Sequence, residues 1–228
     1  MKKYKILAIS DIHLGAKDCN TKFILNTLKN IKAETILIVG DLFDHHNLHR
    51  LKKVHWKVLS KLRKLSKRCK IIYLIGNHCF LKAEFMSILL GFKCLNEYEF
   101  SIEDKSFLAM HGDVFDLYFT KYKFFTNLLI KFYYFIRDIH PYAEDLFKKK
   151  ACSLADKTAN IKNNALIYCN QKDKDYIICG HSHNGEIDGK YINTGSFCED
   201  VCSYVVIDKN GKAEIFYDNK KNKQKKLH

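Results

Sequence analysis

Residues 4–15 read YKILAISDIHLG, an apolar, β-rich run that ends in the polar cluster Asp11-Ile12-His13. A short apolar run of this kind is typical of a buried strand. The same arrangement, a β-rich run followed directly by a polar cluster, occurs at four further places. These clusters are Gly40-Asp41, Gly76-Asn77-His78, His111-Gly112-Asp113 and Gly180-His181-Ser182-His183. Because strand ends at one edge of a sheet bring distant residues together, the pattern predicts a single pocket built from all five.

Segments with helical features separate these strands. Asn20 or Thr21 is suited to cap a first helix, residues 48–66 are helical and basic, and residues 81–91 form a short helix. The remaining apolar runs read as strands: 35–39, 69–75, 107–110, 175–179, 190–193, 203–208 and 213–217. Strands that alternate with helices predict an α/β fold.

An aromatic segment interrupts this alternation after the fourth cluster. Ten of the aromatic residues lie between Gly112 and His140 at roughly helical spacing, and the only proline, Pro141, follows. Residues 142–168 then read as a second, more polar helix. We therefore expect a helical cap, at about residues 114–170, inserted into a single domain of residues 1–218. Residues 219–228 form a basic tail that we expect to be disordered.

Composition limits the partners and the compartment. The net charge of +14 favours anionic partners such as phosphates, nucleotides and acidic lipid headgroups, although a generally lysine-rich proteome explains it equally well. Nucleic acid is not the expected partner. Nine cysteines without a C-x-x-C pair indicate reduced thiols, and no stretch has the length of a transmembrane helix or a signal peptide. We expect a cytoplasmic protein, with peripheral contact to the inner membrane face as a further expectation.

The five clusters supply groups that bind divalent metals. Asp11 and His13, with one residue between them, would point the same way on an extended segment and grip one ion. Asp41 follows a glycine that allows close backbone approach, and its two oxygens can bridge two ions. Asn77 adds a carbonyl oxygen, and imidazoles come from His111, His181 and His183. This oxygen and nitrogen set, without a thiolate, suits Mn, Fe, Zn or Co better than Ca.

Taken singly, each cluster is a weak signal, because a lone D-x-H or G-D is more often a turn or a surface pair. Their order D-x-H, G-D, G-N-H, H-G-D, G-H-S-H resembles that of the calcineurin-like metallophosphoesterases, and the match spans residues 6–196. The resemblance implies a four-layer α/β/β/α sandwich with a binuclear centre between two sheets. It also implies an enzyme that hydrolyses a phosphoester or diphosphate with a metal-bridged hydroxide as the nucleophile.

The resemblance assigns a role to each matching residue. Asp11, His13, Asp41 and His183 would hold one ion, and Asp41, Asn77, His111 and His181 the other, with Mn²⁺ expected and Fe, Zn or Co as alternatives. Asn77 and His78 are the expected catalytic residues, His78 by stabilising the transition state or protonating the leaving oxygen. The family usually has Asp after G-N-H, where this chain has Cys79, so we expect a looser His78 and reduced activity.

Within the family, the motifs SDIHLG, GDLFD, HGDVFD and NTGSFCE resemble those of UDP-2,3-diacylglucosamine diphosphatase and its relatives. That likeness implies a lipid-linked sugar nucleotide as substrate, cleaved to UMP and an acyl-sugar phosphate in lipid A biosynthesis. Candidate substrate contacts are Asp44, His45, Arg137 and Lys148. Two alternatives remain open: a phosphodiesterase or phosphatase acting on nucleotides or phosphoproteins, and a non-catalytic scaffold of the same fold.

Overall fold

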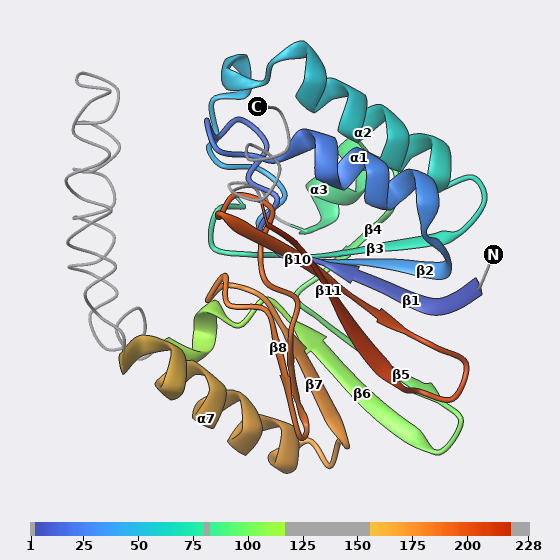
Figure 1. Ribbon diagram of the computed structural model, residues 1–228, viewed down its shortest axis with the longest axis vertical. Coiled ribbons are helices and arrows are strands. Elements are labelled where there is room, and N and C mark those ends of the chain that lie inside the picture. Colours follow the sequence, from blue (N-terminus) through green and yellow to red (C-terminus); the bar gives the residue numbers. More distant parts are fainter. Residues whose placement is uncertain (1–2, 80–82, 117–155, 220–228) are drawn as a thin grey trace, which may run out of the picture.

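The computed structural model describes residues 3–79, 83–116 and 156–219, which form two β-sheets with helices on their outer faces (Figure 1). Residues 117–155 of the expected cap, with Arg137 and Lys148, and the tail lie outside the described residues, whereas residues 156–170 belong to the helix Asp156–Gln171. Among the helices that the structure describes, none combines the length and the apolarity that a membrane crossing requires.

The first sheet has six strands in the order β11-β10-β1-β2-β3-β4. Strands β1 to β4 run parallel to one another, and β10 and β11 add antiparallel strands at one edge. The strands are β1 (Lys3–Ile9), β2 (Lys32–Val39), β3 (Lys70–Leu74), β4 (Lys93–Leu95), β10 (Val201–Ile207) and β11 (Ala213–Asn219).

The second sheet has five strands in the order β5-β6-β7-β9-β8. Strands β6, β7 and β9 run parallel, while β5 and β8 are antiparallel to their neighbours. The strands are β5 (Glu97–Ile102), β6 (Lys105–Met110), β7 (Tyr176–Cys179), β8 (Glu186–Asp188) and β9 (Tyr191–Asn193).

Helices cover the outer face of each sheet. The first sheet carries α1 (Thr21–Asn30), α2 (Lys53–Leu65) and α3 (Ala83–Leu90), and the second carries α7 (Asp156–Gln171) (Figure 1). Two short 3₁₀ helices, η1 (Leu48–Arg50) and η2 (Asp113–Phe115), lie in the connections. The order of layers is helix, sheet, sheet, helix, as the family resemblance implies.

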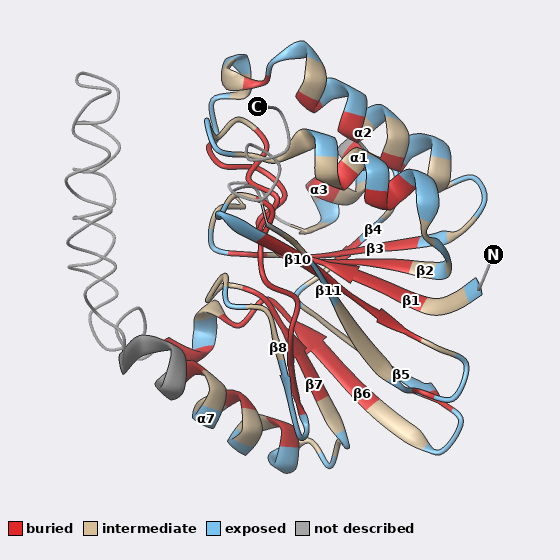
Figure 2. Cartoon of the chain, viewed as in Figure 1, coloured by how far each residue is buried: buried red, intermediate tan, exposed pale blue. Residues whose placement is uncertain are grey.

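Alternation along the central strands builds three cores. In β1, Leu7 and Ile9 face the helices, whereas Ile6 and Ala8 face the second sheet. Side chains at successive strand positions point to opposite faces, so a strand buried on both sides must be apolar throughout. The interior strands are accordingly buried along most of their length in both sheets (Figure 2).

Some expected elements differ in the structure. The continuous helix expected at 48–66 is interrupted, because the Lys52 N–H donates to the His55 Nδ1 (3.1 Å) and begins a new helix there. His55 is consequently buried, and burial lowers its pKa. The short strands β4, β5 and β8 were not expected, since strands of three residues or with half-exposed faces leave a weak periodic signal.

Candidate metal centre

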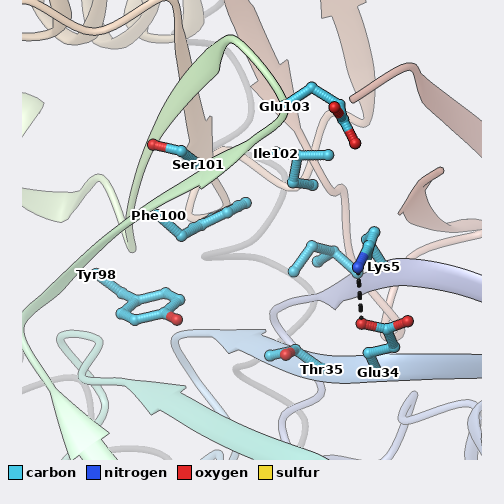
Figure 3. A pocket seen from close by; sticks show the side chains of 9 residues that line it. Lys5, Glu34, Thr35, Tyr98, Phe100, Ser101, Ile102 and Glu103 are labelled. Atoms are coloured by element: carbon cyan, nitrogen blue, oxygen red, sulfur yellow. Dashed lines mark hydrogen bonds and ion pairs between the residues drawn. The ribbon is translucent and has the colours of Figure 1, made fainter. Parts of the chain in front are cut away.

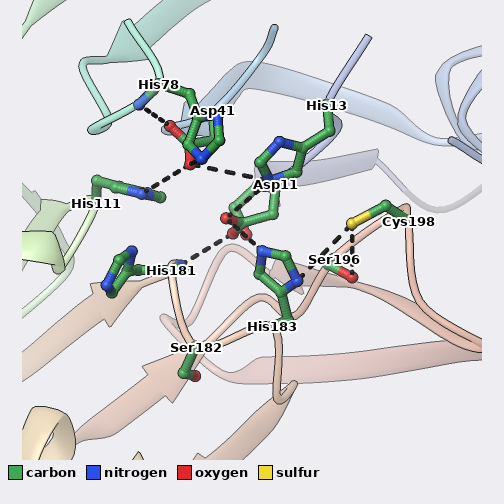
Figure 4. Close-up of polar contacts among 12 residues, drawn as sticks. Asp11, His13, Asp41, His78, His111, His181, Ser182, His183, Ser196 and Cys198 are labelled. Atoms are coloured by element: carbon green, nitrogen blue, oxygen red, sulfur yellow. Dashed lines mark hydrogen bonds and ion pairs between the residues drawn. The ribbon is translucent and has the colours of Figure 1, made fainter. Parts of the chain in front are cut away.

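The five polar clusters meet at one end of the sandwich. Clusters one to three follow the carboxyl ends of β1, β2 and β3, and clusters four and five follow those of β6 and β7. Figure 4 shows their side chains directed toward a common centre between the two sheets. The opposite end carries a separate pocket of about 260 Å³, whose walls include the Lys5–Glu34 ion pair (Figure 3), and none of the five clusters lines it.

Left-handed backbone conformations turn these side chains into the centre. Seven non-glycine residues within the described ranges have positive φ, and five of them are candidate ligands: Asp11, His13, Asp41, His181 and His183. Each such conformation costs roughly 1–3 kcal/mol and concentrates at functional sites. Asp11 and His13 do converge, but the expectation of an extended segment was wrong. Two left-handed residues, at φ 47° each, bring the pair together.

Gly40 makes room for His111. Its φ is +89°, and a Cβ atom at this position would lie 2.0 Å from the His111 Nδ1. The His111 Nδ1 lies 3.0 Å from the Val39 carbonyl oxygen, which can only accept, so this nitrogen carries the proton. The His111 Nε2 therefore faces the centre, 3.1 Å from Asn77 Oδ1 and 3.3 Å from Asp41 Oδ2.

Asp41 lies in the middle of the group. Its Oδ1 accepts the backbone N–H of His78 (3.0 Å). Its Oδ2 is 3.3 Å from the His111 Nε2, 3.9 Å from the His13 Nε2 and 4.0 Å from the His78 Nε2. A carboxylate with imidazoles on both sides has the position that a bridging ligand of two ions needs.

Asp11 organises the other half. Its Oδ2 accepts the backbone N–H of His181 (3.0 Å), which ties the loop after β7 to the loop after β1. Its Oδ1 is 3.2 Å from the His183 Nε2 and 3.8 Å from the His13 Nε2. Three potential ligands thus surround one point, and Asp11 itself is fully buried.

The buried carboxylates and imidazoles perturb one another strongly. Burial alone would raise the pKa of Asp11, but His183 and His13 hold that pKa well below its usual range. Burial alone would lower the pKa of His111, but the charge of Asp41 outweighs burial and raises that pKa to about 10. The pKa of His183 is likewise raised, against burial, by Asp11. The protein without metal therefore holds protons on these imidazoles, in places that a cation would take.

Orphaned polar atoms show that the residues fit a metal. The Asp11 Oδ1 and both ring nitrogens of His13 are buried without a hydrogen-bond partner in the part of the chain that the structure describes. Leaving such groups unsatisfied costs about 1–3 kcal/mol each, so they need another partner. Among the residues that the structure describes, three overlapping groups could hold a metal: His13, His183 and Cys198; His13, Asp41 and His78; and Asp11, Asp41 and His111.

His181 is placed differently from the other predicted ligands. Its ring packs edge-on against His111, with centroids 5.1 Å apart, and its Nε2 lies 3.6 Å from the buried Asp116. It belongs to none of the three groups just named. Its side chain lies at the edge of the centre, and its backbone N–H contacts Asp11.

Asp44 supports the centre from beside it. Its Oδ1 lies 3.7 Å from the His13 Nδ1, its Oδ2 lies 3.3 Å from Arg50, and its backbone oxygen lies 2.8 Å from the His78 Nδ1. Because that carbonyl only accepts, His78 donates from Nδ1 and directs Nε2 toward Asp41. His45 is buried, and its Nδ1 accepts the Asn47 N–H (3.0 Å).

Sequence reasoning missed Cys198 and Glu199. Glu199 Oε1 lies 2.9 Å from the His183 Nδ1, where it orients the ring, and the Cys198 Sγ lies 3.8 Å from the same nitrogen. Both follow β9, which runs parallel to β7 and therefore ends at the same edge of the sheet. The strand at 190–193 was expected and the stretch 193–199 was matched as a motif, but neither residue was assigned a role, because strand order in the sheet decides which loops lie beside His183.

Comparison with known proteins places this geometry in context. The model of a family described as calcineurin-like phosphoesterase matches residues 4–185. An archaeal phosphodiesterase of known structure is 14% identical, with a TM-score of 0.52 over 93% of this chain and 99% of that one. Wild-type Vps29 complexed with Zn²⁺, from Entamoeba histolytica, is 15% identical, with a TM-score of 0.51 over 94% and 98%. Such identities show the fold alone, and no curated protein matches the chain.

Proposed function

This chain belongs to the calcineurin-like phosphoesterase family, and we propose that it is a hydrolase whose metal centre is the cluster at the ends of β1, β2, β3, β6 and β7. The observation that carries the proposal is the buried junction of Asp11, His13, Asp41 and His111. Within the described residues, Asp11 and His13 carry buried atoms without a hydrogen-bond partner, and the ligand atoms of the group stand close enough to share cations.

The proposed ligands divide into two sets that share Asp41. Asp11, His13, Asp41 and His183 would hold one divalent ion, and Asp41, Asn77, His111 and His181 the other. Mn²⁺ is the proposed metal, with Fe, Zn and Co as alternatives of similar ligand preference. When bound, two such ions polarise a phosphoryl group and lower the pKa of water, which supplies the nucleophile.

His78 is the proposed catalytic residue that is not a ligand. With Nδ1 donating to the Asp44 carbonyl, its Nε2 is the nitrogen that faces the centre. Only the imidazolium carries a proton on Nε2, so transfer to a leaving oxygen requires the charged ring. We expected a looser His78 because Cys79 stands where the family usually has Asp; the hydrogen bond to the Asp44 carbonyl would orient the ring instead. Asn77 would contribute by holding the His111 side of the centre.

The proposed substrate has a phosphorylated head and an apolar part. An apolar groove of about 510 Å³ lies between α2 and α3, with Phe43, Leu51 and Trp56 among its walls and Arg63 and Lys64 at its rim. One wall residue, Phe43, immediately precedes Asp44, which contacts His13 at the centre. This neighbourhood supports a lipid-linked sugar nucleotide, UDP-2,3-diacylglucosamine, cleaved to UMP and acyl-sugar phosphate by a protein that contacts the inner membrane face. The second candidate is a phosphodiesterase or phosphatase acting on nucleotides or phosphoproteins.

Two substrates separate these possibilities. The full chain with Mn²⁺ would be assayed on bis-p-nitrophenyl phosphate and on UDP-2,3-diacylglucosamine, with His111→Ala as the inactive control. We expect wild-type turnover of both and a loss of at least roughly a hundredfold in the variant. No hydrolysis of either substrate would refute the enzyme proposal, and turnover of the simple ester alone would refute the lipid substrate.

A variant of the groove tests the apolar part of the substrate directly. Trp56 is half exposed on the groove wall, and Trp56→Ser should raise KM for the diacylated substrate about tenfold while leaving the simple ester unaffected. Ile167→Ser is the matched control, because Ile167 is exposed to a similar extent on α7, the helix that covers the other sheet. Equal effects of the two variants would exclude the groove as an acyl site.

A further inference from the structure

Cys198 lies beside the His13–His183 side of the centre. Its Sγ is 3.8 Å from the His183 Nδ1, and one ligand atom from each of His13, His183 and Cys198 lies within 4.8 Å of the others (Figure 4). Ligand atoms on one tetrahedral Zn²⁺ stand about 3.6 Å apart, so small side-chain rotations close this group around an ion.

The backbone fixes the position of this thiol. The Phe197 N–H donates to the Asp11 carbonyl oxygen (3.0 Å), and the fully buried Phe197 ring packs on Phe23 with centroids 5.3 Å apart. On the other side, the Ser203 N–H donates to the Ser196 carbonyl oxygen (3.1 Å). The loop after β9 is therefore tied to the residue that organises the centre, and Cys198 is presented to it.

A second observation points to a ligand at the same place. His13 is buried, with 6% of its surface exposed, and neither of its ring nitrogens has a hydrogen-bond partner in the described part of the chain. A buried imidazole that makes no hydrogen bond within the described residues, beside a thiol, offers nitrogen and sulfur to one cation. The Asn77–His111 half of the centre, by contrast, offers oxygen and nitrogen.

We propose that Cys198 is a thiolate ligand that allows the Asp11–His13–His183 half of the centre to bind thiophilic cations such as Zn²⁺, Co²⁺ and Cd²⁺. The inference rests on the proposed function, because it adds a ligand to the proposed centre. When the sulfur–metal bond forms, the thiol proton passes to solvent and no group changes oxidation state. Thiolate favours these metals over Mn²⁺, so the two halves of the centre should differ in metal preference.

Cobalt spectroscopy tests the sulfur ligand without using activity. The full chain would be loaded with Co²⁺, its metal content measured, and its near-ultraviolet spectrum compared with that of Cys198→Ser. We expect a sulfur-to-cobalt charge-transfer band in the wild type and its loss in the variant. Cys69→Ser is the matched control, and the band should persist in it. Cys69 lies just before β3, at the opposite end of that strand from the centre, and its thiol donates to the Leu65 carbonyl oxygen (3.4 Å).

Metal affinities provide the second readout. Cys198→Ser should weaken Cd²⁺ binding at one of two sites by at least roughly tenfold and leave Mn²⁺ binding unchanged. Three outcomes would each overturn the inference, because Cys198 would then only support His183. They are bound cobalt without the band, a band that survives in Cys198→Ser, and equal losses of affinity for Cd²⁺ and Mn²⁺ in that variant. Those outcomes leave the proposed function standing, whereas absence of any metal binding would overturn both.

Discussion

Replacing Gly40 with alanine should disrupt the centre through a single methyl group. The new Cβ would lie 2.0 Å from the His111 Nδ1, whereas non-bonded atoms pack at about 3.5 Å, so the ring must retreat by about 1.5 Å. Its hydrogen bond to Val39 would break, which costs about 1–3 kcal/mol for a buried donor. The φ of +89° adds about 1–2 kcal/mol for any residue with a Cβ. We expect a free energy of unfolding lower by about 2–5 kcal/mol.

Function should suffer more than stability. A displacement of this size moves the His111 Nε2 away from Asp41 and Asn77, and misplacement by about 1 Å can cost a hundredfold in rate. Urea unfolding and Mn²⁺ titration would measure the two effects separately. Gly189→Ala is the control, since Gly189 also has a positive φ, +56°, but nothing lies within 4 Å of its added Cβ. If the two variants lose equal stability and both retain metal affinity, the argument from steric overlap is refuted.

Further predictions concern protons and supporting residues. Asp41 raises the pKa of His111 from 6.5 to about 10, against the effect of burial. The stability that this pair gives the metal-free protein is therefore complete below pH 6.5 and is lost as the pH rises to about 10. Urea titrations across that range, with and without metal, would reveal the loss. Metal must displace these protons, so Mn²⁺ affinity should rise with pH over the same interval in calorimetry, and a flat profile would contradict the assignment. Asp44→Asn should weaken Mn²⁺ binding by about 10–100-fold by releasing His13, whereas Asp188→Asn, which removes an exposed acid near Lys162, should not.

The positions of the candidate ligands could be predicted, but their conformations could not. An apolar run followed by a polar cluster marks where a buried strand ends, and that local pattern located Asp11, Asp41 and His111 correctly at one edge. The left-handed φ of Asp11 and His13 left no such trace, because Asp and His adopt both signs of φ and the surrounding contacts decide between them. The extended geometry expected for this pair was wrong for that reason.

Supporting residues were the hardest to foresee. Arg50 reaches Asp44 only because the expected helix breaks before Lys53, and the break depends on a hydrogen bond to His55 rather than on proline or glycine. The spacing of apolar residues cannot show where a helix breaks when a single side-chain hydrogen bond decides the break. Short strands such as β8 fall under the same limit.

The sequence by itself determined the family, the alternation of strands and helices, and the kinds of metal-binding group, since these depend on local composition and order. Only the tertiary structure decided which groups share one ion-sized space. Cys198 stands 15 residues after His183, and it reaches the centre because β9 pairs in parallel with β7 and ends beside it. Strand pairing is a long-range choice, governed by which apolar faces bury each other, and no short window of sequence records that choice.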